Sequence, residues 1–422
     1  MCNNENRILK KYYMKVLWFV QENFDPSKEK GGYNGAGWIS SLRNEIVKKK
    51  GIDLALAFFS NKSKQGTANG VRFYSMPTPI LSSLKKIRFR LKKQYTKEEE
   101  ALWSNYRAEM LKVLDDFKPD IIQIFGSENK YGLVASVTTI PIVLHIQGIV
   151  RPCLNAYLPP FFSWDKSLRF ATVLQKTQKA NWESLEYCEK EVFRHVKNYI
   201  GRTLWDKRII QVLSPDCNYY WGSEILRDTF YDCSAKRSIP QKLTIVSTIS
   251  IPLYKGFDMI LKAASLLKEC YHIDFEWRVV GNVQPFLVEK SIGINHHDVN
   301  VTLLGVLNAE QLKRELLNST LYFHPSYIDN SPNSVCEAQM LGISCIGTNV
   351  GGVSSIIEDG KTGFLVPAND PIQASFLIKQ IFDDSTLNLQ VGINAQKIAK
   401  KRHDKQHIVD SLVDLYKNLI EK

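Results

Sequence analysis

Two short apolar runs between residues 321 and 367 flank a segment of helical character, and this order constrains the fold most. The first run is Leu321 to Pro325, the second is Ile343 to Gly347, and a glycine pair, Gly351-Gly352, follows them. Parallel neighbouring strands need a crossover connection, so the order predicts a parallel β-α-β unit. The chain therefore has an α/β fold, in which ligands bind beyond the carboxyl ends of the strands.

The loop that follows the first of these strands begins at Asp329 and leads past Pro332 into the helix. A proline near the first helical position gives up an amide that has no partner inside the helix. The sequence therefore predicts free backbone amides at Asn333, Ser334 and Val335. Free amides at the positive end of a helix favour phosphate.

A second acid, Glu337, follows eight residues after Asp329, one to two turns into the predicted helix. From that position a carboxylate reaches past bound phosphates toward paired hydroxyls such as those of a ribose. Each acid taken alone also fits a solvated surface charge. The order of strand, acid, helix amides, acid, strand and glycine pair favours the binding role.

This stretch resembles the nucleotide-sugar-binding half of retaining GT-B glycosyltransferases of family four, the group 1 type, in its bacterial surface-polysaccharide subset. Those proteins carry Glu-x7-Glu here, followed by a Gly-Gly turn. This chain has Asp329 at the first position, one methylene shorter, and Glu337 at the second. The resemblance implies two Rossmann-like α/β domains facing across a cleft, with a C-terminal helix that crosses back to the N-terminal domain.

The length of 422 residues, 44% of them apolar, is enough for two sizeable cores. The predicted parts are a Rossmann-like acceptor-side domain, an interdomain linker, a Rossmann-like nucleotide-sugar-binding domain and the crossover helix, at residues 14–214, 215–241, 242–400 and 401–422 respectively. Residues 61–116 have a less regular pattern that ends in a charged helix.

Two further features of the N-terminal half support the resemblance. The predicted strand Met14 to Val20 leads into a loop with Gly31 and Gly32. The resemblance implies that this loop approaches the donor phosphates or the acceptor, although a tight turn alone also needs glycine. His145 ends another predicted strand, at the ligand edge. The resemblance implies a role near the sugar or the acceptor; the alternative is a histidine of the core.

Cations for a diphosphate are expected from both halves of the chain. Lys255 precedes a glycine in the loop after the predicted strand 242–250, where the resemblance implies an arginine and a lysine that grip the same phosphates. This chain has Ser250 at the arginine position. Arg202, in a Gly-Arg-Thr-x-Trp-Asp segment, is the expected substitute from across the cleft; the alternative is a salt bridge to Asp206.

The activity that the resemblance implies is transfer of a sugar from a nucleotide diphosphate sugar, UDP- or GDP-linked, to an acceptor hydroxyl, with retention. Neither a metal nor a cofactor is expected, because fixed donors aimed at the departing phosphate oxygen lower the barrier. The expected catalytic residues are Asp329 and His145. The expected donor-binding residues are Gly31, Gly32, Arg202, Lys255, Ser331, Asn333, Ser334, Val335 and Glu337.

The net charge of +12 arises in good part from a basic segment, Lys85 to Lys93. Such a segment rests on an anionic bilayer surface or is simply solvated, and no nucleic acid partner is expected. Eight cysteines without a Cys-x-x-Cys pair and the lack of a long apolar run predict a cytoplasmic protein, peripheral on the inner face of the plasma membrane. The expected acceptor is a sugar or a lipid-linked sugar in surface polysaccharide or glycolipid assembly.

A non-catalytic alternative remains on the sequence. The chain could be an inactive GT-B scaffold that binds a membrane surface or nucleic acid, and the departures at Asp329 and Ser250 favour this alternative. An epimerase or a phosphorylase has no specific support in the sequence.

Overall fold

The structure is a computed structural model that describes residues 13–21, 37–79, 97–163, 171–232, 237 and 239–421, with the side chains of 97–99 and 171–177 left aside. Three predictions lie outside the described residues, namely those for Gly31, Gly32 and the basic segment Lys85 to Lys93.

The N-terminal domain is built on an eight-stranded sheet with the order β3-β4-β2-β1-β5-β6-β7-β8. Every pair in it is parallel except β3 with β4. Its strands are β1 (Met14–Phe19), β2 (Ile52–Ser60), β3 (Lys64–Ala68), β4 (Val71–Pro77), β5 (Ile121–Phe125), β6 (Ile142–His145), β7 (Asn198–Gly201) and β8 (Asn218–Trp221). Its helices are α1 (Gly37–Ile46), α3 (Lys97–Phe117), η2 (Tyr131–Ser136), α4 (Val150–Asn155), α5 (Ala171–His195) and α6 (Leu204–Leu213).

Strands β3, β4 and β8 of this sheet were not predicted from the sequence. Strands β3 and β4 form a hairpin in a range that was expected to be irregular. Its turn is Asn69-Gly70, both at positive φ (51° and 75°), which is the strongest short-range signal for a hairpin. Strand β8 lies inside the predicted linker, so the sheet extends to Trp221.

The C-terminal domain has a six-stranded, wholly parallel sheet with the order β11-β10-β9-β12-β13-β14. Its strands are β9 (Leu243–Thr248), β10 (Phe275–Val280), β11 (Val301–Gly305), β12 (Leu321–His324), β13 (Cys345–Thr348) and β14 (Phe364–Val366). Its helices are η3 (Asp228–Phe230) at the entrance, α7 (Phe257–Glu269), α8 (Phe286–Ile292), η4 (His297–Val299), α9 (Ala309–Leu317), α10 (Asn333–Met340), η5 (Val353–Ser355), α11 (Pro371–Asp383) and α12 (Ser385–Arg402). The β-α-β unit predicted around Asp329 is therefore confirmed as β12-α10-β13.

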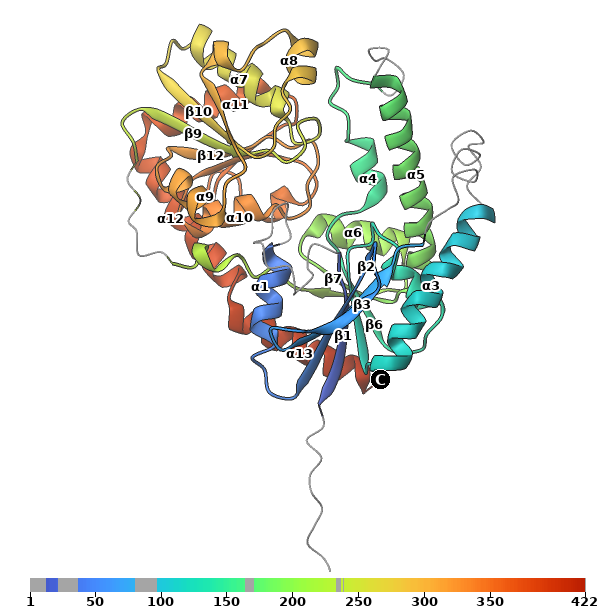
Figure 1. The fold of residues 1–422 in the computed structure, drawn as a ribbon. Coiled ribbons are helices and arrows are strands. Elements are labelled where there is room, and N and C mark those ends of the chain that lie inside the picture. The colour runs from blue at the N-terminus through green and yellow to red at the C-terminus, as the bar shows by residue number, and fades with distance from the viewer. Residues whose placement is uncertain are drawn as a thin grey trace, which may run out of the picture.

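The last helix, α13 (Lys405–Ile420), crosses back to the N-terminal domain, as Figure 1 shows in red. Its apolar face shares one buried cluster with β1 and α1. Inside that cluster the indole Nε1 of Trp18 donates to the hydroxyl of Tyr416 at 2.9 Å, and this hydroxyl also bonds to Gln123. The predicted crossover helix is thus confirmed.

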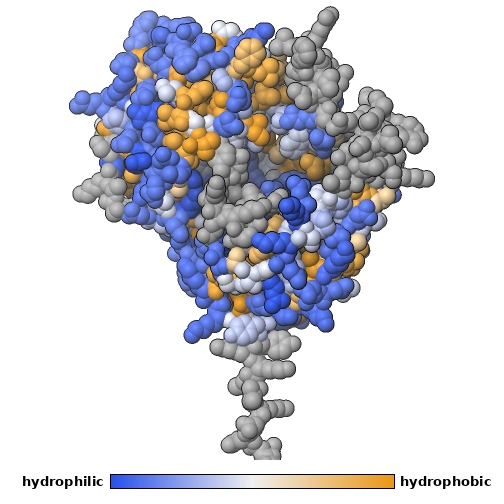
Figure 2. Space-filling model, viewed as in Figure 1, coloured by the Kyte–Doolittle hydropathy of each residue, from blue (hydrophilic) through white to orange (hydrophobic). Residues whose placement is uncertain are grey.

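The two domains meet where the strands of each sheet end at their carboxyl edges (Figure 1). Aromatic contacts tie the α4 region to the C-terminal domain, because the rings of Tyr157 and Tyr254 lie 5.7 Å apart and Lys262 lies 4.8 Å from the ring centre of Phe161. On the face shown in Figure 2, hydrophilic residues predominate and hydrophobic ones gather mainly over the C-terminal domain. Among the described residues, no helix has the length and apolar character needed to cross a membrane.

Candidate functional site

The acidic loop between β12 and α10 carries the first predicted site residues. Pro332 is extended (φ −69°, ψ 110°) and precedes the first helical residue, Asn333. The amide of Val335 donates to the carbonyl of Pro332 at 3.0 Å, so the prediction of a free amide at Val335 is wrong. The first turn of α10 already uses the amide of Val335 as a hydrogen-bond donor. The helix start thus offers the amides of Asn333 and Ser334, and the buried Oδ1 of Asn333 has no hydrogen-bond partner in the described structure.

Glycines let the neighbouring turns approach this loop. Gly351 has φ +53°, and a Cβ on it would lie 1.9 Å from the carbonyl oxygen of Asp329. Gly256 has φ +74°, and a Cβ there would lie 2.0 Å from the carbonyl oxygen of Pro325. A side chain at either position would displace the acidic loop, since L-residues rarely adopt such φ values.

Asp329 lies in an ion pair with Lys255 at the adjacent ends of β12 and β9. The Nζ of Lys255 lies 2.5 Å from Oδ2 of Asp329, and Nε2 of His324 lies 3.0 Å from the same oxygen. Burial favours the neutral acid, but Lys255 and His324 hold the pKa of Asp329 far below its usual value. Burial likewise opposes charge on Lys255, but Asp329 raises its pKa. Both groups therefore carry charge at neutral pH.

His324 is a site residue that the sequence reading missed. It ends β12 at the ligand edge, which is the same signal that drew attention to His145. Its ring is buried, its Nδ1 has no partner among the described residues, and burial lowers its pKa. A neutral imidazole that donates from Nε2 would orient the carboxylate of Asp329.

Glu337 is held by an arginine of the interdomain connection. Nε and Nη2 of Arg227 donate to the two carboxylate oxygens of Glu337, each at 2.7 Å. The side chain of Glu337 is 5% exposed and that of Arg227 is 26% exposed. A bidentate pair occupies two of the four lone-pair directions of a carboxylate, so Glu337 keeps acceptor capacity for hydroxyls. No pattern in the sequence indicates Arg227 as the partner of Glu337.

His145 lies in the core of the N-terminal domain. Its ring centre is 4.9 Å from that of Trp38 and 5.7 Å from that of Phe125, and its Nδ1 lies 3.4 Å from Nε2 of Gln123. Burial, aided by the nearby Arg202, lowers the pKa of His145 to about 3. The imidazole is therefore neutral at neutral pH and cannot act as a cationic proton donor.

Arg202 turns toward the interdomain connection. Its guanidinium lies 3.9 Å from Oε1 of Glu224, 5.2 Å from the ring centre of Trp38, and donates to the carbonyl of Ile146 at 3.4 Å. Asp206 accepts from the backbone amide of Arg202 at 3.0 Å. The alternative of a side-chain salt bridge to Asp206 is therefore wrong, because the side-chain partner is Glu224.

Ser331 belongs to the same buried network. Its hydroxyl donates to Oε1 of Glu224 at 2.5 Å. Burial would raise the pKa of Glu224, but Arg202 and His403 together with this hydroxyl lower it to about 2. Glu224 is thus a buried anion that joins the acidic loop to Arg202, and it lies in the range that was predicted as linker.

Two further acids lie beyond the carboxyl ends of β5 and β6. Glu189 is 2% exposed and accepts from the hydroxyl of Ser127 at 2.5 Å and from the amide of Val150 at 3.1 Å. Burial raises the pKa of Glu189 to about 8 and that of Glu128 to about 7. Glu128 and the two partners of Glu189, Ser127 and Val150, follow the ends of β5 and β6, so both acids lie at the carboxyl edge of the N-terminal sheet.

We expect Glu189→Gln to flatten part of the pH dependence of stability. Between about pH 4.3, the usual glutamate value, and about pH 8 the folded chain retains a proton at Glu189 that the unfolded chain has released. The free energy of unfolding of the native protein therefore falls as pH rises, by at most about 1.4 kcal/mol per pH unit for this one group. Urea unfolding at pH 5 and pH 8 measures the difference, and a variant that loses stability in parallel with the native protein contradicts it.

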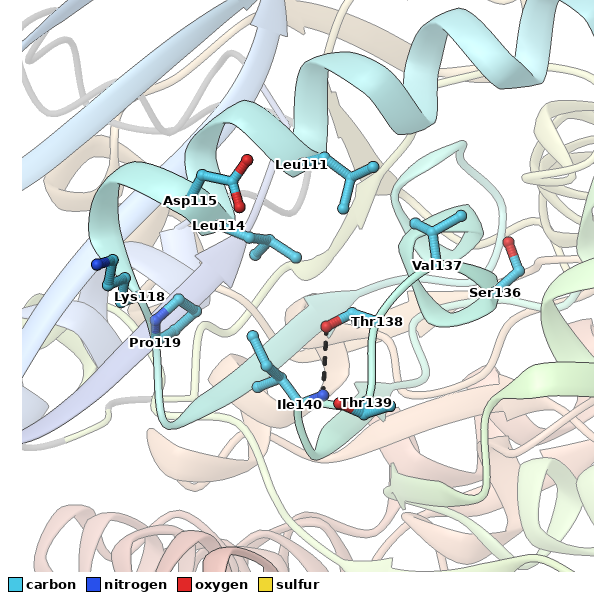
Figure 3. A pocket seen from close by; sticks show the side chains of 10 residues that line it. All are labelled: Leu111, Leu114, Asp115, Lys118, Pro119, Ser136, Val137, Thr138, Thr139 and Ile140. Atoms are coloured by element: carbon cyan, nitrogen blue, oxygen red, sulfur yellow. Dashed lines mark hydrogen bonds between the residues drawn. The ribbon is translucent and has the colours of Figure 1, made fainter.

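Metal ligands do not gather in this part of the chain. Among the described residues, no group of three or more histidine, cysteine, aspartate or glutamate side chains is arranged to hold a metal ion. A surface hollow lies elsewhere, at the amino ends of β5 and β6, where Figure 3 shows Leu111 and Leu114 of α3 on one side and Val137 and Ile140 on the other. It is on the opposite edge of the sheet from the site.

Comparison with known proteins matches the C-terminal half to one family. The model of "Glycosyl transferases group 1" matches residues 234–398. The D-inositol 3-phosphate glycosyltransferase of Paenarthrobacter aurescens is 28% identical over 160 residues, which cover 36% of this chain and 38% of that protein. The capsular polysaccharide biosynthesis glycosyltransferase CapM of Staphylococcus aureus is 27% identical over 105 residues, covering 25% and 28%. The chain thus spans well under half the length of these curated relatives.

Solved structures resemble the whole chain in fold. Sucrose-phosphate synthase from Thermosynechococcus elongatus superposes with a TM-score of 0.72 at 13% identity, covering 97% of this chain and 99% of that one. WaaG, a glycosyltransferase of lipopolysaccharide biosynthesis, gives 0.64 at 14% identity, covering 95% and 99%. Anabaena Alr3699/HepE in complex with UDP and glucose gives 0.61 at 14% identity, covering 96% and 100%. Residues 234–398 are therefore similar to group 1 glycosyltransferases, and the chain as a whole has the GT-B fold.

Proposed function

We propose that this protein transfers a sugar from a nucleoside diphosphate sugar to an acceptor hydroxyl. The observation that carries the proposal is that Lys255, Asp329 and the start of α10 come together at adjacent strand ends, with Glu337 deeper along the same helix. This set supplies a cation, helix-start amides and a hydroxyl acceptor in the order that a diphosphate and its ribose require.

The chemistry follows from the charges. When the bond between the sugar and the diphosphate breaks, negative charge develops on the departing phosphate oxygen. Lys255 and the amides of Asn333 and Ser334 would stabilise that charge because they are already fixed. Asp329 alone would repel a diphosphate, but its pairing with Lys255 and His324 keeps the local charge balanced. Asp329 would then orient the sugar ring.

The proposal also covers the stereochemistry of the transfer, its independence of metal, and the classes of donor and acceptor. The resemblance to retaining enzymes supports retention of configuration, and the positive charge of Lys255 supports a reaction that needs no metal. Structures on this fold were solved with UDP-glucose and with UDP together with fondaparinux and alpha-GlcNAc-glycerol, which supports uridine-linked donors as the first to try. The likeness to CapM and WaaG supports an acceptor in surface polysaccharide or glycolipid assembly.

A panel of nucleotide sugars tests the donor. A ligand present at about a hundred times its dissociation constant stabilises the folded protein by about 2.7 kcal/mol, which a thermal-shift assay detects. In the variant Glu337→Ala, we expect the dissociation constant for the active nucleotide to rise roughly 10- to 100-fold, since a hydrogen bond to a charged group contributes about 1.5 to 3 kcal/mol.

Glu315→Ala is the matched control. Glu315 is also an ion-paired carboxylate of the C-terminal domain, but it lies on α9 and pairs with Arg278. Nucleotide affinity should stay unchanged in it. Failure of every nucleotide and nucleotide sugar to bind the native protein contradicts the proposal and favours a non-catalytic scaffold. Transfer that is abolished by EDTA and restored by a divalent cation contradicts the metal-free extension.

A further inference from the structure

The side chain next to the catalytic candidate Asp329 reaches into the other domain. Oδ1 of Asn330 accepts from the hydroxyl of Thr203 at 2.6 Å. Its Nδ2 donates to Oδ2 of Asp206 at 2.9 Å and to the carbonyl of Gln147 at 3.3 Å. Asn330 is 4% exposed, and Thr203 and Asp206 are fully buried. One amide of the C-terminal domain is thus bonded on both sides by the N-terminal domain.

Hydrogen bonds within the N-terminal domain fix the orientation of the two side chains that contact Asn330. Thr203 and Asp206 form the capping box of α6, in which the threonine oxygen accepts from the amide of Asp206 at 3.2 Å. The hydroxyl of Tyr219 donates to the other oxygen of Asp206 at 2.5 Å. The threonine oxygen is occupied as an acceptor, so its proton points to Asn330. The site therefore presents one donor and one anionic acceptor, which a neutral amide matches and a carboxylate does not.

Further contacts between the two domains lie close to Asn330. The amide of Leu204 donates to the hydroxyl of Ser355 at 3.0 Å. A Cβ on Gly352 would lie 2.7 Å from Cβ of Thr203, so only glycine lets the two domains approach here. The amide of Gly352 donates to the carbonyl of Asp329 at 2.9 Å. The backbone of Asp329 is therefore held on one side by the bond to Gly352 and on the other, through Asn330, by the bonds to the start of α6.

We propose that Asn330 is a positioning residue that couples closure of the two domains to the placement of Asp329, through its bonds to Thr203 and Asp206. This proposal rests on the proposed function and extends it. The Gly-Arg-Thr-x-Trp-Asp segment thereby gains a role for its threonine and aspartate. When the domains separate, the Asn330 side chain loses its partners in the N-terminal domain and the acidic loop keeps only the contacts within its own domain, so the position of Asp329 is fully fixed only in the closed arrangement.

Asn330→Asp tests the match of donor and acceptor with almost no change in shape. At pH 8 its carboxylate faces that of Asp206, and we expect kcat to fall at least tenfold relative to the native protein. Arg202, Glu224 and Asp329 are the other charged groups around this contact. On lowering the pH to about 5.5, a proton shared by the two carboxylates replaces the lost N–H, since one of two adjacent acids has a raised pKa. The deficit relative to the native protein should therefore shrink at the lower pH.

Asn330→Ala is the matched control. Alanine can form neither the bond to Thr203 nor the bond to Asp206, so this variant should show the same deficit in kcat at both pH values. The dissociation constant of the free nucleoside diphosphate should stay within twofold in both variants, since the nucleotide binds the C-terminal domain. Native kcat in a folded Asn330→Ala protein, or a deficit in Asn330→Asp that does not depend on pH, overturns the proposal.

A scattering measurement separates this proposal from the proposed function. Small-angle X-ray scattering on the full chain should give a larger radius of gyration for Asn330→Ala than for the native protein, whether or not a nucleotide sugar is a substrate. An unchanged radius overturns the coupling, whereas failure of all nucleotides to bind overturns the proposed function alone.

Discussion

Replacement of Lys255 by alanine is expected to lower kcat for sugar transfer by about 10² to 10³, because one fixed donor to a developing oxyanion contributes about 2.7 to 4 kcal/mol. Lys255 lies 2.5 Å from Asp329 and at the same strand ends as the start of α10. The variant therefore loses the cation aimed at the diphosphate and leaves the carboxylate of Asp329 with His324 and the backbone amide of Asn330 as partners.

The change also acts on Asp329. Without Lys255 the charged carboxylate repels the diphosphate, and its pKa rises because Lys255 no longer favours the charged form. Steady-state kinetics with the donor found in the nucleotide panel measures the loss. A circular dichroism spectrum and a thermal midpoint establish that the variant is folded.

Lys268→Ala is the matched control for this experiment. Lys268 lies in the last turn of α7, the helix that begins just after Lys255, and its Nζ donates to the exposed carbonyl of Asp298. Its loss should leave kcat unchanged. Activity close to that of the native protein in folded Lys255→Ala would refute the phosphate-binding role of Lys255.

Replacement of Tyr416 by alanine is expected to lower the free energy of unfolding by about 3 to 5 kcal/mol, the range for large aromatic side chains removed from a core. Tyr416 is fully buried on α13 and bonds through its hydroxyl to Trp18 of β1 and Gln123 of β5. The change creates a cavity and also leaves two buried polar groups without partners.

A second variant separates these two contributions. Tyr416→Phe keeps the ring and removes only the hydroxyl, so we expect a loss of about 1 to 3 kcal/mol from the unsatisfied groups. Urea unfolding followed by tryptophan fluorescence, to which Trp18 contributes together with the other tryptophans of the chain, measures both losses. The exposed neighbour Lys417, changed to alanine, should leave the midpoint unchanged. Equal stability of Tyr416→Ala and the native protein would mean that α13 does not hold the N-terminal domain.

The sequence by itself determined the parts whose evidence is local. The spacing of apolar residues predicted the strands and helix around Asp329, and Pro332 marked where that helix begins. Period and caps depend on residues a few positions apart, so a single chain reveals them. The Asn69-Gly70 hairpin was within reach of the same reasoning and was missed because its first strand, β3, is short and polar.

Only the tertiary structure decided which charged groups become partners. Arg227 and Glu337 are 110 residues apart, and Asn330 and Asp206 are 124 apart. His324 became the partner of Asp329 only when the loop folded back on its own strand. A pattern of residue types shows that a side chain is polar and near a strand end, but not what it faces. Burial makes each unpaired charge costly, so the packing of the two domains selects these pairs, and that packing is a property of the whole chain.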